Sequence, residues 1–117
     1  MMIIKKNKAV LITFDTDKNK FKSDYERNKF YRGLHGWKQI IPAEKGNYCY
    51  DRKGLLNDIP HIKVADSAFI VELRNMQKMM DYFEEWADKV HCEMMRITLD
   101  HMKITEMRKK GHHVEIE

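Results

Sequence analysis

Two aspartates stand two positions apart where a strand-forming segment ends. Residues 9–14 read Ala-Val-Leu-Ile-Thr-Phe, and Asp15 and Asp17 follow. Magnesium and manganese prefer oxygen ligands and need only one or two carboxylates beside the phosphates of a substrate. Asp15 is therefore a candidate catalytic residue and metal ligand for cutting a phosphodiester. Aspartate also ends strands through local hydrogen bonds in turns, so a structural role stays open, and Asp17 is expected to shape the loop.

A basic segment begins immediately after these aspartates. Its cationic residues are Lys18, Lys20, Lys22, Arg27, Lys29 and Arg32. The first 38 residues carry a net charge of +6 and the remaining 79 carry −2, within a total of +4. Such asymmetry predicts either a surface that attracts phosphate backbones by releasing their counterions or simply a solvated face.

A second cluster combines rings with cations. It consists of Tyr48, Tyr50, Arg52 and Lys53. A tyrosine ring here would stack on a nucleobase while the cations contact phosphates. Alternatively, the two tyrosines pack this part of the chain onto the sheet. The candidate nucleic-acid-binding residues are Lys18, Lys20, Lys22, Arg27, Lys29, Arg52 and Lys53.

The other reactive residue types show no recognised pattern. None of the six histidines forms H-x-H or H-x-x-x-H, and Cys49 and Cys92 have no metal-ligand spacing. We expect reduced structural thiols. The sequence holds no phosphate-binding loop and no nucleophile-elbow motif.

The composition indicates one globular domain. With 117 residues, 43% of them hydrophobic and 34% charged, residues 1–117 suffice for a single modest core. No apolar run approaches the roughly 18 residues that span a bilayer. We therefore expect no membrane partner and a cytoplasmic location.

The elements that must position these residues alternate along the chain. Strands are predicted at 9–15, 37–42, 67–73 and 93–99, and helices at 24–34 and from residue 76. The second helix is expected to bury one face, formed by Met76, Met79, Met80, Phe83, Ala87 and Val90. Ser23 and Glu26 form a capping-box pattern, and Gly36 is expected to end the first helix. Residues 43–66 are predicted to form a long, irregular and partly ordered excursion, in which a short strand and a turn within 47–54 stay open. Two short alternating runs after residue 101 predict a hairpin.

This order predicts an α+β fold of the ferredoxin-like type, βαββαβ, with an additional C-terminal strand or hairpin. In that arrangement the first and third strands are central and antiparallel. The segments 9–15 and 67–73 are also the most apolar of the predicted strands, which independently favours this placement.

Four stretches resemble a known family, the small second core protein of CRISPR adaptation. They are residues 11–15, 67–72, 95–99 and 111–117. The first resembles the family's opening strand, which ends in a metal-associated aspartate, and the last its C-terminal strand, which often docks on the other subunit. The pattern is also similar to that of the related virulence-associated protein D ribonucleases. The family joins its middle strands by a compact connection, whereas residues 43–66 form a long connection at that place in this chain.

The resemblance implies a cytoplasmic ferredoxin-fold homodimer that acts on RNA or DNA beside an integrase partner. It also implies Asp15 as the ligand of Mg²⁺ or Mn²⁺. Such a dimer is either a metal-dependent endonuclease, for RNA or for DNA, or a non-catalytic adaptor. Two other hypotheses stay open: a non-catalytic ferredoxin-like module that binds nucleic acid or protein, and a purely structural subunit.

Overall fold

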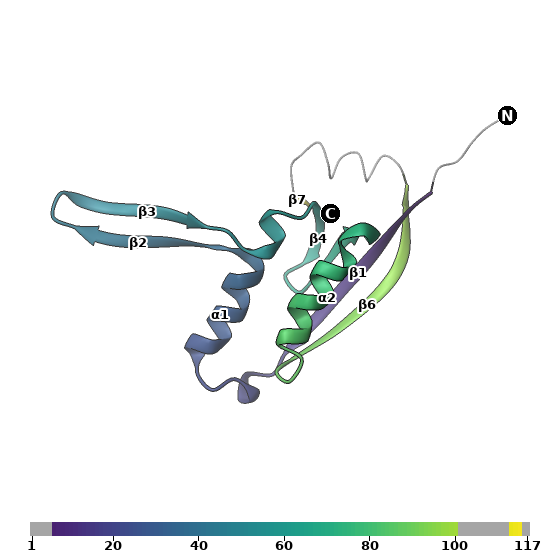
Figure 1. Ribbon diagram of the computed structural model, residues 1–117, viewed down its shortest axis with the longest axis horizontal. Helices are drawn as coiled ribbons and strands as arrows, with labels where there is room; N and C mark the ends of the chain where they lie inside the picture. Colours follow the sequence, from purple (N-terminus) through teal and green to yellow (C-terminus); the bar gives the residue numbers. More distant parts are fainter. Residues whose placement is uncertain (1–5, 101–112, 116–117) are drawn as a thin grey trace.

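The strand that ends near Asp15 lies inside a five-stranded sheet. The computed structural model describes residues 6–100 and 113–115. Strand β1 (Lys6–Thr16) pairs antiparallel with β5 (Ala68–Glu72) on one side and with β6 (Val90–Asp100) on the other (Figure 1). The predicted central position of this strand, next to the strand near residue 70, is confirmed.

Two further strands extend the sheet beyond β5. The order is β6-β1-β5-β4-β7, where β4 (His61–Ala65) is antiparallel to β5 and β7 (His113–Glu115) runs parallel to β4. The C-terminal strand therefore pairs within its own chain over these residues. Most of the hairpin predicted after residue 101 lies outside the described residues.

Helix α1 (Asp24–His35) has the predicted ends. The Ser23 Oγ accepts a hydrogen bond from the Glu26 backbone N–H at 3.2 Å, which satisfies one of the free donors of the first turn. At the other end Gly36 has φ of 80° and its N–H donates to the Arg32 carbonyl. Glycine adopts this backbone conformation without the penalty that a Cβ imposes.

Helix α2 (Met76–Glu85) ends before the last of the apolar residues that follow helical spacing in the sequence. Met79 and Phe83 are buried as predicted, but the helix ends at Glu85 and Val90 already belongs to β6. Ala87, expected on the buried face, is exposed in the connecting turn. The described residues also form the 3₁₀ turns η1 (Lys18–Lys20), η2 (Leu55–Asn57) and η3 (Leu73–Asn75).

Both helices cover the same face of the sheet. Their buried side chains share one core cluster with alternate residues of the strands: Val10, Ile12, Phe14, Phe30, Leu34, Phe69, Val71, Met79 and Phe83. Phe14 and Phe30 meet edge to face with ring centroids 5.6 Å apart. The opposite face carries a second cluster of buried apolar residues around Ala9, Ile62 and Ile70. We call the part of this face beyond that cluster, where Asp15 and Met95 are exposed, the open face.

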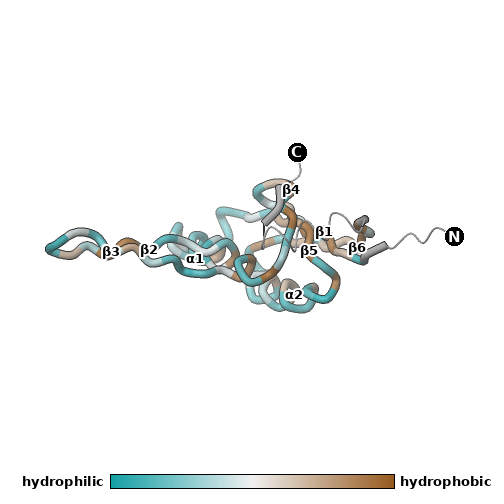
Figure 2. Tube along the Cα trace, turned by 90° about the horizontal axis from the view of Figure 1, so that it is seen from above, coloured by the Kyte–Doolittle hydropathy of each residue, from teal (hydrophilic) through white to brown (hydrophobic). Residues whose placement is uncertain are grey.

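A β-hairpin projects from the body of the molecule. Strand β2 (Trp37–Ala43) pairs only with β3 (Gly46–Arg52) among the described residues, and the two form a separate sheet. Figure 1 shows the hairpin extending away from the upper end of α1. In Figure 2 the hairpin lies on the far side of α1 from the main sheet, and some of its residues are hydrophobic.

Two predictions about this region are therefore wrong. The segment at 37–42 forms the expected strand but does not join the main sheet. Residues 43–66 are not irregular, since besides β3, which covers the short strand considered within 47–54, they contain η2 and β4. β4 occupies the place beside β5 because its Ile62 is completely buried there, whereas Ile40 of β2 is 62% exposed. A two-residue turn lets β2 pair with the segment nearest in sequence.

At the root of the hairpin, the backbones of Gly36 and Gly54 are in direct contact. A Cβ on Gly54 would lie 2.2 Å from the backbone N of Gly36, so the two chain segments touch backbone to backbone. The Gly54 N–H donates to the Asn57 Oδ1 at 2.6 Å. This contact holds together the points where the hairpin leaves and rejoins the body.

Candidate nucleic-acid interface

Asp15 is exposed at the carboxyl end of β1. Phe14 and Thr16 face the helices, so Asp15 points to the open face, where its pairing partner on β6 is His91. Both residues line a shallow hollow of about 200 Å³, together with Asp17, Lys20 and Lys89. The position at the strand end is the one predicted.

Asp17 has a structural role in the loop. One of its carboxylate oxygens accepts a hydrogen bond from the Asn19 N–H at 3.0 Å, which caps η1. Beside it, the Thr16 hydroxyl and the Tyr31 hydroxyl are 3.0 Å apart and tie the end of β1 to α1. The expectation that Asp17 shapes the loop is confirmed.

In the part of the chain that the structure describes, no cluster of three metal-ligating side chains forms at Asp15. No three His, Cys, Asp or Glu side chains converge on one point within residues 6–100 and 113–115. His91, the pairing partner of Asp15 on β6, has its Nε2 3.2 Å from the Glu93 carboxylate. The carboxylates that line the hollow are those of Asp15 and Asp17, and Asp17 is already engaged in capping η1.

The basic residues after Asp15 separate into three environments. Lys18, Lys20 and Lys22 are exposed on the loop at the N-terminal end of α1, opposite the end that carries the hairpin (Figure 1). Arg27 is less accessible than the other predicted binding residues, because its guanidinium lies 5.5 Å from the Tyr31 ring centre. Lys29 lies further along the outer side of the helix.

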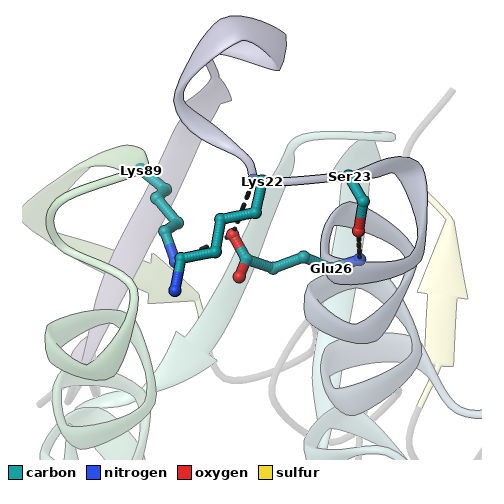
Figure 3. A network of polar contacts seen from close by, with 4 residues as sticks. All are labelled: Lys22, Ser23, Glu26 and Lys89. Atoms are coloured by element: carbon teal, nitrogen blue, oxygen red, sulfur yellow. Dashed lines mark hydrogen bonds and ion pairs between the residues drawn. The ribbon is translucent and has the colours of Figure 1, made fainter.

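Glu26 holds the loop that precedes α1 in place through two contacts. Its carboxylate accepts a hydrogen bond from the Lys22 N–H at 3.0 Å and pairs with the Lys89 Nζ at 2.8 Å (Figure 3). The hydrogen bond from Lys89 is the main reason that the pKa of Glu26 is lowered, and the same bond raises the pKa of Lys89. This contact joins the start of α1 to the turn between α2 and β6.

Acid is therefore expected to weaken this contact. A carboxyl whose pKa is lower in the folded state stabilises the fold above its unfolded pKa, near 4.5, and this contribution is lost as the pH falls through the folded value. Glu26→Gln should lower the melting temperature at pH 7 but hardly at pH 3. Thermal melts of both proteins across this range test the prediction, and an equal difference at both pH values would contradict it.

The outer side of α1 and the root of the hairpin form a second basic surface. Six residues line a groove of about 260 Å³, which we call the basic groove: Tyr25, Lys29, Arg32, Gly33, Trp37 and Lys53. The Arg32 guanidinium lies 4.2 Å from the Trp37 ring centre, within the range of a cation–π contact. Tyr25 is 75% exposed at the groove.

The structure brings together Lys29 and Lys53, which belong to two separate clusters in the sequence. Lys53 also pairs with Asp58 at 3.9 Å, but both side chains are mostly exposed, so the pair is weak. Tyr25 and Trp37 were missed as candidate site residues. Tyr25, Lys29 and Arg32 follow helical spacing, and this signal could have placed them on one outer face of α1.

The chain matches no protein-family model, no curated protein and no solved structure significantly. Within the described part of the chain, no helix combines the length and the apolar character needed to cross a bilayer.

Proposed function

We propose that the protein is a ferredoxin-like domain that binds nucleic acid. The connections β1–α1–β4 and β5–α2–β6 and the strand order β6-β1-β5-β4 support this fold, because they are those of a split βαβ arrangement. Both helices cover one face, as this arrangement requires. The hairpin is then an insertion between α1 and β4.

The observation that carries the proposal is the stacked pair of Arg32 and Trp37 in the basic groove. A guanidinium over an indole keeps its positive charge beside an aromatic surface, and the groove adds Lys29 and Lys53. Cations contact the phosphates of a nucleic acid, and rings stack on its bases. The six residues lining the groove include no carboxylate.

The proposal predicts binding that weakens steeply with salt. Each phosphate contact in a single strand releases about 0.7 counterions, so contacts from the three groove cations alone give a slope of about −2 in log K against log salt. Titration of a fluorescent oligonucleotide between low and physiological salt measures this slope. Absence of binding to any nucleic acid at low salt would refute the proposal.

A metal-dependent nuclease built from two copies is the second candidate function, as the CRISPR-adaptation resemblance implies. Asp15 is exposed on the open face, and the same face carries a hollow of about 390 Å³ near Leu11 and Met95, the latter 61% exposed. Burying this face between two copies would supply a second Asp15. An integrase partner belongs to this candidate alone.

The nuclease candidate makes Asp15→Ala the informative change. Cleavage of RNA or DNA in Mg²⁺ or Mn²⁺ is expected to fall at least 100-fold if Asp15 is a metal ligand, whereas binding to oligonucleotides should persist. Glu85→Ala, which removes an exposed carboxylate from the last turn of α2, is the matched control. Equal cleavage by wild type and Asp15→Ala would remove Asp15 from the mechanism.

A further inference from the structure

The two strands of the hairpin carry different side chains on their two faces. Side chains alternate along each strand, and directly paired residues share a face. The pairs Trp37–Arg52, Gln39–Tyr50 and Ile41–Tyr48 therefore share one face, which we call the aromatic face. The opposite face carries Lys38–Asp51, Ile40–Cys49 and Pro42–Asn47.

The two tyrosine rings of the aromatic face are open to solvent. Tyr48 is 59% exposed and Tyr50 is 46% exposed. The Arg52 guanidinium lies 5.5 Å from the Tyr50 ring centre, and its Nε donates a hydrogen bond to the Gln39 Oε1 at 2.7 Å. Arg52 is therefore held beside the ring in a defined position.

Charge on this face has one sign. Arg52 is the charged residue of the aromatic face, while Asp51, the single carboxylate within β2 and β3, points to the opposite face beside Lys38. Trp37 belongs both to this face and to the basic groove. The aromatic face and the groove are thus one continuous surface that runs from Tyr48 at the outer part of the hairpin to Tyr25 on α1.

We propose that the aromatic face binds single-stranded nucleic acid, with unpaired bases stacked on Tyr48 and Tyr50 and phosphates on Arg52. This inference rests on the proposed function and names its substrate class. Tyr48 and Tyr50 are two residues apart in one strand, so successive rings are separated by about 7 Å. Bases in a duplex are about 3.4 Å apart and cover one another's faces, so rings spaced in this way suit an extended strand with unstacked bases.

The position of the hairpin, which projects from the body of the molecule, supports single-stranded nucleic acid as the ligand of the aromatic face. A two-stranded hairpin that is covered by nothing is marginally stable in water, and large rings on its surface gain by being covered. A base covers a ring without requiring a shaped apolar pocket in the partner. The positive charge of Arg52, together with Lys29, Arg32 and Lys53 in the groove, complements the phosphate backbone that such bases carry.

The test compares single strands with a duplex. Binding of wild type and of Tyr48→Leu/Tyr50→Leu is measured with a 20-nucleotide oligothymidine, an oligouridine of the same length, and a duplex of mixed sequence. Leucine preserves apolar bulk but cannot stack, so single-strand affinity is expected to fall about tenfold for each ring, with little change for the duplex. The wild-type affinities for the oligothymidine and the oligouridine distinguish DNA from RNA, and loss of the preferred single strand by the leucine variant supports the inference.

Two controls keep the test specific. Tyr48→Phe/Tyr50→Phe retains the rings and should keep wild-type affinity, which also shows that the hairpin tolerates substitution. Ile40→Ala alters an exposed residue of the opposite face and should change nothing. Circular dichroism and a thermal melt check that each variant is folded.

The outcomes separate this inference from the function on which it rests. Unchanged single-strand affinity in a folded leucine variant, or equal losses for single strands and duplex, would overturn the stacking inference and leave nucleic-acid binding intact. Absence of binding to all three probes would overturn both. Sedimentation of wild type and leucine variant adds a further outcome, because loss of self-association in the variant would make the aromatic face a contact between copies and overturn the inference.

Discussion

Gly54→Ala is expected to destabilise the protein by about 3 kcal/mol or more, at the upper end of the cost of overpacking. The new Cβ would lie 2.2 Å from the Gly36 N and 2.7 Å from the carbonyl carbons of Leu34 and His35. These are backbone atoms at the end of α1, so relief requires the end of the helix or the hairpin to move. The root of the hairpin should therefore loosen in this variant.

Urea unfolding followed by circular dichroism measures this loss. Fluorescence of Trp37, which lies at the root of the hairpin, reports the local change, although Trp86 contributes a second signal. Gly46→Ala is the matched control. Gly46 differs from Gly54, whose φ is −98°, in having a positive φ of 127°, and no atom lies within 4 Å of a Cβ built there, so backbone strain alone should cost about 1–2 kcal/mol. Equal stability of the two variants would contradict the proposed backbone contact.

Neutralising Lys29 and Arg32 together is expected to reduce the affinity for single-stranded nucleic acid about 25-fold at 0.1 M salt. Each phosphate contact contributes about 0.7 to the salt slope, so two lost contacts lower log K by about 1.4 relative to 1 M salt. The slope itself should become shallower by the same 1.4. Arg32→Gln also removes the cation from the Trp37 ring.

Salt titrations of Lys29→Gln/Arg32→Gln measure both quantities. The matched control is Lys8→Gln/Lys78→Gln, which removes the same charge from exposed positions on β1 and α2. If binding depended only on net charge, the two double variants would lose affinity equally. That outcome would show that nucleic-acid binding does not depend on the basic groove in particular.

Local signals in the sequence were sufficient for most of the regular elements. The apolar run of β1, the capping serine and terminal glycine of α1, and the strand at β5 all lie where they were predicted. Each of these signals depends on neighbouring residues alone, because strand alternation and helix capping are properties of short segments. The exposed position of Asp15 at a strand end follows in the same way.

The candidate site was predictable in composition but not in arrangement. Lys29, Arg52 and Lys53 were identified from their charge. Arg27 was identified too, yet it lies against Tyr31 and is less accessible. Helical spacing could have indicated Tyr25, but the proximity of Trp37 to Arg32 depends on the angle at which the hairpin leaves α1.

Patterns within short segments are thus enough to predict a buried strand with Asp15 near its end, two amphipathic helices and a basic first third. Tertiary structure alone decided which segment pairs with β5, since β2 and β4 are both strand-forming and the choice depends on which one buries its apolar side chains. It also decided that Gly36 and Gly54 meet. That contact between residues 18 positions apart leaves no local pattern, and it sets the direction of the hairpin and hence the surface that the basic and aromatic residues share.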